Sequence, residues 1–74
     1  MRIVDAASFG SALRKQRKRL GYTQAQVAAF SGCSAVFLSA LENGKPTAEL
    51  GRALRVANTL GINITANQRN GDAL

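Results

Sequence analysis

Most of the residues in this chain that could do chemistry are cationic. Ten Lys and Arg stand against four Asp and Glu, which gives the 74 residues a net charge of +6 at pH 7. The chain has no histidine and a single cysteine, so we expect neither a His/Cys zinc site nor an internal disulfide. The carboxylates are scattered and no phosphate-binding glycine loop occurs, which argues against an enzyme and against a cofactor or small-molecule substrate. Nucleic acid is therefore the first partner to consider, and an anionic membrane surface the second.

One predicted helix of this basic chain carries no positive charge of its own. Residues 31 to 47 read SGCSAVFLSALENGKPT and contain this helix, Ala35 to Asn43, without Lys or Arg. Charge is needed mainly for phosphate contacts, whereas base edges are read by hydrogen bonds and apolar contacts. The cations around this helix are candidates for phosphate contacts: Arg14, Lys15, Lys18, Arg19 and Lys45. The alternative for each of them is an ordinary solvated helix face.

The elements that must position these residues follow helical periods. Asp5 or Ser8 is suited to cap a first helix that ends near Leu20. A second helix begins at Thr23-Gln24-Ala25-Gln26, which fits the capping box, and stops near Gly32.

Two further helices are predicted. Ser34 caps the helix without Lys or Arg over residues 35 to 43, and Gly44 suits the left-handed position after it. The fourth helix is predicted from a Thr47 cap to Leu60. Its inward side is predicted from apolar residues at helical spacing: Leu50, Ala53, Leu54, Ala57 and Leu60. The fold expected for residues 5–61 is an all-α bundle of about four to five helices.

The segment after this bundle has a strand pattern. Four residues alternate apolar with polar side chains: Ile62, Asn63, Ile64 and Thr65. A lone strand leaves its backbone groups unpaired, and Ile3-Val4 is only a weak candidate partner. We therefore predict a dimerisation strand over residues 62–66 that pairs with its copy in a homodimer. The alternative is an extended segment laid on the helices, and residues 67–74 are predicted to form a mobile tail.

Composition also bears on where the protein works. The longest apolar runs are far too short to span a bilayer, and the N-terminus lacks the layout of a signal peptide. The helices need their bulky apolar residues for packing, which disfavours membrane association. With three Phe and one Tyr, the chain also lacks the stacking sheet typical of RNA-binding modules. We expect a cytoplasmic protein, and double-stranded DNA remains as the candidate partner to be tested against the helices.

Two helices of about eight and nine residues joined by Gly32-Cys33-Ser34 match the helix-turn-helix, whose second helix lies in the DNA major groove. Residues 23 to 47, TQAQVAAFSGCSAVFLSALENGKPT, resemble the helix-turn-helix of the phage repressor and Cro superfamily, also called the xenobiotic response element family. The matching positions are Thr23-Gln24, Val27-Ala28, Gly32, Leu38 and Leu41-Glu42-Asn43-Gly44-Lys45. The resemblance covers roughly residues 9 to 61.

A narrower resemblance involves residues 37 to 64, FLSALENGKPTAELGRALRVANTLGINI, which look like HipB-type antitoxins. In that group the helix-turn-helix runs into a GKPT turn, one more helix and a short terminal strand used for dimerisation. The resemblance implies a repressor of its own operon that also binds a HipA-like kinase toxin, as the antitoxin of a type II toxin–antitoxin module. The alternative is a free-standing phage-type repressor without a toxin partner.

The superfamily resemblance implies DNA contacts for particular residues. Thr23 and Gln24, at the start of their helix, would contact the DNA backbone, and Gln24 would contact a phosphate. The alternative for Gln24 is a role in the capping environment alone. Phe37 would lie beside the DNA backbone or, alternatively, in the core. The base-facing positions are Ser34, Ala35, Val36 and Ser39, whose hydroxyl and methyl groups can contact base edges. The alternative for these four is that they merely face solvent.

The small residues at positions 35 and 36 depart from relatives that carry Arg, Lys or Gln there. This departure predicts that DNA shape carries part of the specificity, or that binding is weak unless a partner joins. A homodimer would need an inverted-repeat operator, with recognition helices about 34 to 36 Å apart.

The resemblance also implies a salt bridge between Arg17 and Glu42, which ties the first helix to the recognition helix. Cys33 is predicted to be a small apolar filler at the turn, with a reactive thiol as the alternative. Phe30 is expected near the surface, as a satellite of the core or as a partner contact.

Overall fold

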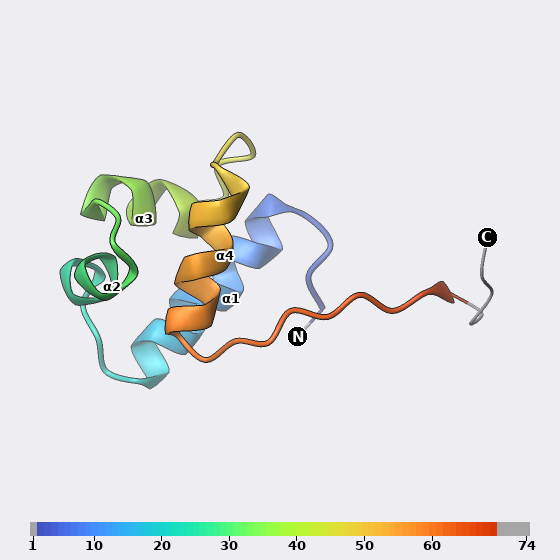
Figure 1. Ribbon diagram of the computed structural model, residues 1–74, viewed down its shortest axis with the longest axis horizontal. Helices are drawn as coiled ribbons and strands as arrows, with labels where there is room; N and C mark the ends of the chain where they lie inside the picture. The colour runs from blue at the N-terminus through green and yellow to red at the C-terminus, as the bar shows by residue number, and fades with distance from the viewer. Residues whose placement is uncertain (1, 70–74) are drawn as a thin grey trace.

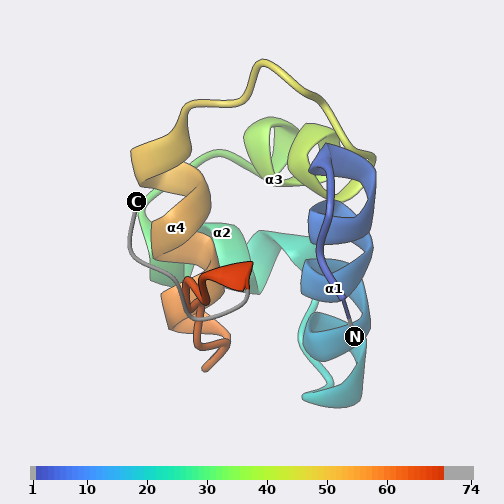
Figure 2. The same cartoon turned by 90° about the vertical axis from the view of Figure 1, so that its right-hand side faces the viewer.

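The computed structural model describes residues 2–69, and within that range it contains helices and no β-strand. The four helices are α1 (Ala6–Arg19), α2 (Gln24–Ser31), α3 (Ala35–Glu42) and α4 (Leu50–Thr59). Helix α2 packs against α3 and α4, and α3 packs against α1. Figure 1 shows α2 and α3 together at one end of the molecule. Figure 2 shows α1 and α4 on opposite sides, with α3 across the top. The predicted helical bundle is confirmed.

Side-chain caps set where the first three helices begin. Asp5 accepts a hydrogen bond from the Ser8 N–H at 2.8 Å, and the Ser8 hydroxyl accepts one from the Asp5 N–H at 3.1 Å. Both candidate residues therefore take part in one capping box, with Asp5 as the N-cap. Thr23 and Gln26 form the predicted box at α2, and Ser34 caps α3. The ends of these helices lie within one residue of the predicted ends.

The prediction for the start of α4 is wrong. The helix begins at Leu50, and its N-cap is Glu49 rather than Thr47. The Glu49 carboxylate accepts hydrogen bonds from the N–H groups of Gly51 at 3.0 Å and Arg52 at 2.7 Å. It thereby satisfies two unpaired donors of the first turn and places a negative charge at the positive end of the helix dipole. Thr47 lies in the turn that precedes the helix.

One apolar cluster holds the four helices together. Its buried members are Leu13, Val27, Ala28, Leu38, Leu41, Ala53, Val56, Ala57 and Leu60. The predicted inward side of α4 is partly wrong, because Leu50 is 68% exposed and Leu54 is 40% exposed, whereas Val56 is fully buried. Each helical residue turns by about 100°, so Val56 shares a side with Ala53 and Leu60 while Leu54 falls at its edge. Leu50 lies in the first turn of the helix, beyond the end of the cluster.

Helices α1 and α3 approach each other closely at Gly10, a buried residue of α1. A Cβ atom at this position would overlap the Leu41 carbonyl oxygen and come within 2.7 Å of the Glu42 carbonyl oxygen. Only a residue without a side chain lets the two backbones meet there. Gly10 therefore fixes how the end of α3 sits on α1.

The C-terminal residues leave the bundle in an extended form. Ile62 packs against the core, whereas Ile64 is half exposed. Figure 1 shows this segment passing the end of α4 and running away from the helices. The predicted strand is not formed in a single copy, because a strand needs a second one for its backbone hydrogen bonds and Ile3-Val4 does not supply it. Residues 70–74 of the predicted tail lie outside the described residues.

Between residues 2 and 69, no single helix is long and apolar enough to cross a membrane. Within this range, only α2 and α3 taken together are long and apolar enough, and the chain bends by 110° at the break between them.

Candidate nucleic-acid interface

Helices α2 and α3 are joined by a tight turn of three residues. Gly32 adopts a left-handed conformation, with φ of 72°, and ends α2. The Cys33 N–H then donates to the Ala28 carbonyl at 3.0 Å, which closes the end of the helix. The resulting bend of 110° between α2 and α3 lies within the range of about 90–120° typical of a helix-turn-helix.

The accessible side of α3 carries small uncharged residues. Leu38 and Leu41 face the core, and Ser34, Ala35 and Val36 are exposed, Val36 by 80%. Ser39 is partly exposed on the same helix. The Ser34 hydroxyl oxygen accepts from the Phe37 N–H at 3.0 Å, so its O–H remains able to donate to another acceptor. All four residues predicted to face bases are thus accessible to solvent.

Two residues predicted to contact the DNA backbone also have roles within the fold. Thr23 caps α2, and Gln24 donates from its amide nitrogen to a Glu42 carboxylate oxygen at 3.0 Å. This contact joins the start of α2 to the end of α3 and was not predicted. An amide nitrogen carries two hydrogens, so Gln24 keeps one donor for a phosphate.

The implied ion pair between Arg17 and Glu42 is present. The Arg17 Nε and Nη2 atoms donate to the two Glu42 carboxylate oxygens at 2.7 and 3.0 Å, and Nη1 donates to the Tyr22 carbonyl at 2.9 Å. Both side chains are buried, with 10% of the Arg17 side chain and 2% of the Glu42 side chain exposed. The pair ties α1 to the end of the recognition helix.

Two opposing effects act on the pKa of Glu42. Burial acts to raise it, but the hydrogen bonds from Arg17 and Gln24 and the charges of Arg17 and Arg14 outweigh burial, so the pKa lies below its ordinary value. The hydrogen bond to Glu42 raises the pKa of Arg17. Both residues are therefore held in their charged forms.

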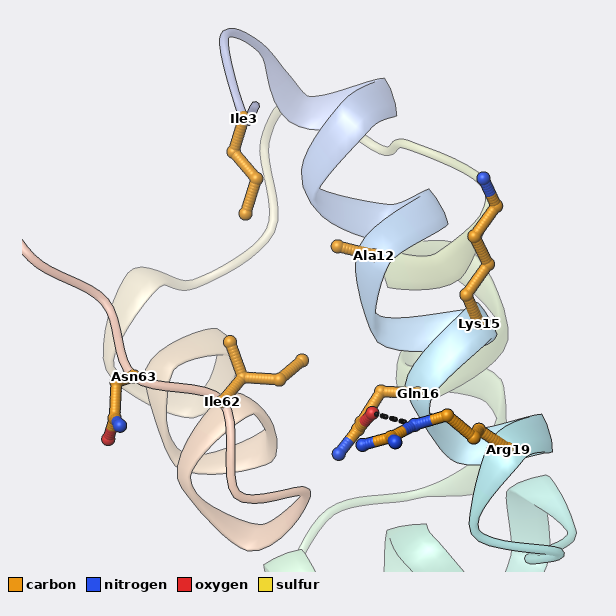
Figure 3. Close-up of a pocket in the computed structure, with 7 residues that line it drawn as sticks. All are labelled: Ile3, Ala12, Lys15, Gln16, Arg19, Ile62 and Asn63. Carbon is orange, nitrogen blue, oxygen red and sulfur yellow. Dashed lines mark hydrogen bonds between the residues drawn. The ribbon is translucent and has the colours of Figure 1, made fainter. Parts of the chain in front are cut away.

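The predicted phosphate-binding cations divide between two surfaces. Arg14, Lys18 and Lys45 are exposed, and the charge of Arg14 is felt by Glu42 at the end of α3. Lys15 and Arg19 instead line a groove of about 350 Å³ with Ile3, Ala12, Gln16, Ile62 and Asn63, as Figure 3 shows. In that groove the Arg19 Nε donates to the Gln16 amide oxygen at 3.0 Å.

The structure places two further cations beside the turn, and the sequence patterns had not pointed to them. Arg52 and Arg55 lie on the exposed side of α4, and their positive charges act on the thiol of Cys33. Burial nevertheless raises the pKa of that thiol overall, which agrees with the predicted role of Cys33 as an apolar filler packed on the core. The sequence offered only a weak signal for these two cations, since Arg52 and Arg55 are ordinary positions of α4 outside its apolar stripe.

Three of the four aromatic residues lie on or next to α2 and α3. Phe37 packs partly against the core. Its ring centroid lies 6.0 Å from the guanidinium carbon of Arg52. Phe30 is 59% exposed and makes an edge-to-face contact with Tyr22, with ring centroids 5.4 Å apart. Phe30 is therefore at the surface, as expected.

The bend, the three-residue turn and the accessible first turn of α3 define a helix-turn-helix, a class of fold that presents its second helix to DNA. Residues 13–67 match the family described as Helix-turn-helix. The chain is also 40% identical, over 63 residues, to an uncharacterized HTH-type transcriptional regulator, y4mF, of Sinorhizobium fredii, and the match covers 85% of this chain and 83% of that protein. The chain therefore belongs to the helix-turn-helix family of transcriptional regulators.

Solved structures show the same fold. A HipB–O4 20mer complex matches with a TM-score of 0.84 at 20% identity, over 95% of this chain and 99% of that chain. A HipA-HipB-O2-O3 complex matches with a TM-score of 0.85 at 20% identity, with the same coverage. The restriction-modification controller protein C.AhdI from Aeromonas hydrophila matches with a TM-score of 0.70 at 30% identity, over 80% of this chain and 86% of that chain. The predicted superfamily and the resemblance to HipB are confirmed.

Proposed function

We propose that this protein is a sequence-specific transcriptional repressor that binds an inverted-repeat operator as a homodimer. The observation that carries the proposal is the accessible, uncharged side of α3 at the end of a helix-turn-helix, in a chain with a net charge of +6. In this arrangement Ser34, Ala35, Val36 and Ser39 meet base edges, while surrounding cations neutralise phosphates.

Dimerisation would use the C-terminal segment. Ile64 is half exposed, and the extended backbone of residues 62–66 has no strand partner among the described residues. Pairing of residues 62–66 with the same segment of a second copy would satisfy these backbone groups. It would also relate two α3 helices by a two-fold axis, as required for successive major grooves about 34 to 36 Å apart.

Within this function we propose the role of an antitoxin that represses its own operon and binds a HipA-like kinase toxin. The likeness to HipB supports this role, because it extends over 95% of the chain and so includes α4 and the residues after it. The likeness to C.AhdI, a controller protein with higher sequence identity, supports the second candidate, a free-standing repressor without a toxin partner. The two candidates share the DNA-binding mechanism.

Binding to DNA upstream of the gene tests the repressor function. The purified protein is titrated against this duplex and against a scrambled duplex at several salt concentrations. We expect a preference of at least about a thousandfold for the upstream duplex. Ser39→Ala should erode that preference, whereas Ser11→Ala, the same change on α1, should leave it intact. Equal binding to both duplexes, fading together as salt rises, would count against sequence-specific repression.

The neighbouring open reading frame tests the antitoxin role. If that frame encodes a kinase-like protein, the two purified proteins should form a stable complex, and co-expression should relieve any toxicity of the kinase. An unrelated neighbour, or a kinase-like neighbour that does not bind, would favour the free-standing repressor.

A further inference from the structure

Two arginines of α4 reach the turn of the helix-turn-helix. A Cβ atom built on Gly32 would lie only 3.8 Å from the Nη1 atom of Arg55, which places that guanidinium at the turn. The guanidinium carbon of Arg52 lies 6.0 Å from the ring centroid of Phe37, the third residue of α3. Both arginines therefore flank the N-terminal end of α3, although they are distant from it in sequence.

Most of the hydrogen-bonding capacity of these two side chains is free. Within residues 2–69 neither guanidinium donates a hydrogen bond, and 62% of the Arg52 side chain is exposed. Among the described residues, the carboxylate paired with Arg52 is that of Glu49, whose Oε2 atom lies 3.9 Å from the Nε atom of Arg52. Its oxygens already accept the N–H groups of Gly51 and Arg52, so Glu49 weakens the positive field without occupying either guanidinium.

The recognition helix needs such a source of charge, since α3 itself has no Lys or Arg. The guanidinium group presents a planar set of donors that matches a phosphate group, and it stays charged at any physiological pH. Phosphate contacts fix the position of a protein on the duplex and leave the reading of bases to other groups. A pair of arginines beside the first turn of α3 can therefore hold one DNA strand against a helix that has no positive charge of its own.

We propose that Arg52 and Arg55 form a phosphate clamp that binds the DNA backbone beside the N-terminal end of α3, with Phe37 as the positioning residue for Arg52. The proposal rests on the DNA-binding function proposed above and adds a specific source for its phosphate contacts. The Phe37 ring restricts where the Arg52 guanidinium can lie, which lowers the entropy lost when it meets a phosphate.

The chain supplies a matched control for this clamp. Lys15 and Arg19 are also two exposed cations, but they line the groove between α1 and the C-terminal segment, and the Nε atom of Arg19 already donates to Gln16. The double variants Arg52→Gln/Arg55→Gln and Lys15→Gln/Arg19→Gln therefore remove equal charge from two different surfaces. A purely nonspecific attraction between DNA and a basic chain would respond equally to both.

The experiment measures affinity for the upstream duplex and for the scrambled duplex as a function of salt. Each neutralised phosphate contributes about 0.9 to the slope of log K against log salt concentration. Loss of two contacts in Arg52→Gln/Arg55→Gln should therefore reduce the slope by about 1.8 and weaken binding roughly 60-fold at about 0.1 M salt. Both duplexes should weaken alike, because phosphates carry no sequence information. Lys15→Gln/Arg19→Gln should change the slope by less than about 0.5.

Two single variants test the parts of the clamp. Phe37→Leu should weaken binding to both duplexes while its thermal midpoint stays within a few degrees of the wild-type value, and Phe37→Tyr should restore the affinity. Glu49→Gln keeps an acceptor for the start of α4 but removes the nearby negative charge, and it should tighten binding. If Phe37→Leu lowers the thermal midpoint and leaves the affinity for DNA unchanged, its role is only structural and the positioning part of the proposal falls.

The outcomes separate this inference from the proposed function. If the two double variants have equal salt slopes while the wild type still prefers the upstream duplex, the clamp is overturned and the repressor function stands. If the wild type does not prefer the upstream duplex, but the larger slope change is still found only in Arg52→Gln/Arg55→Gln, the repressor function is overturned and the clamp is supported. Absence of any DNA binding by the wild type would overturn both.

Discussion

The ion pair between Arg17 and Glu42 makes a quantitative prediction about stability. Glu42→Gln keeps the shape of the side chain but removes the charge opposite a guanidinium whose side chain is only 10% exposed. Loss of one partner from a buried pair typically costs about 3–5 kcal/mol. We expect about 3 kcal/mol, the lower end, because glutamine can still accept one hydrogen bond and Arg17 keeps the Tyr22 carbonyl.

This loss is large for so small a protein. At roughly 0.05–0.15 kcal/mol per residue, a chain of 74 residues has a free energy of unfolding of about 4 to 11 kcal/mol. For a domain of this size, about 3 kcal/mol lowers the thermal midpoint by roughly 12 to 24 °C. Because Glu42 ends α3 and also holds Gln24, the substitution should weaken DNA binding indirectly.

The assay is urea denaturation at pH 7, followed by circular dichroism, for the wild type, Glu42→Gln, Arg17→Met and the double variant. Glu49→Gln serves as the control, because it makes the same change at an exposed carboxylate and should shift the midpoint far less. Each single change in the buried pair should destabilise the fold, and the double variant should lose much less than their sum. A loss below about 1 kcal/mol for Glu42→Gln, or losses that simply add, would refute the reasoning.

Three further predictions concern the folded chain. Alanine usually stabilises a helix interior by about 0.5–1 kcal/mol over glycine, but Gly10→Ala should lower the thermal midpoint because its Cβ would overlap the backbone of α3; an unchanged or higher midpoint would contradict the close approach. Ser34→Ala should destabilise the protein by about 1 kcal/mol through loss of the cap on α3, and Ser34→Gly by only a few tenths, in the same melting assay; equal losses would argue against the capping bond. The pKa of Glu42 is lowered in the folded state, so its contribution to stability is present above its unfolded pKa of about 4.3 and is lost as pH falls through the folded value. The urea midpoint should therefore fall more steeply between about pH 5 and pH 3 in the wild type than in Glu42→Gln, and parallel curves would exclude this linkage.

Much of the helical framework was predictable because its signals are local. The cap at Asp5, the capping box at Thr23 and the left-handed Gly44 each depend on residues within a few positions, and the structure confirms all three. The start of α4 was predicted at the wrong residue, because Thr47 is a favoured cap by residue type, whereas Glu49 caps the helix through a side chain that reaches the N–H groups of Gly51 and Arg52. The strand predicted for residues 62–66 depends on a second copy, so one chain cannot form it.

The candidate interface was predictable in part. The resemblance pointed to the Arg17–Glu42 pair, which the structure contains, and to the accessible residues of α3. It did not point to the bond between Gln24 and Glu42, or to Arg52 at the turn.

The sequence by itself determined the presence of four helices, the caps of the first three and the helix-turn-helix class, because hydrogen bonds and apolar spacing within a few residues specify them. Only the tertiary structure decided that Val56 rather than Leu54 is buried, and that Arg55 lies at Gly32. These features depend on contacts between segments far apart in the chain. Such contacts exist only after the helices pack and each side chain finds the space its neighbours leave.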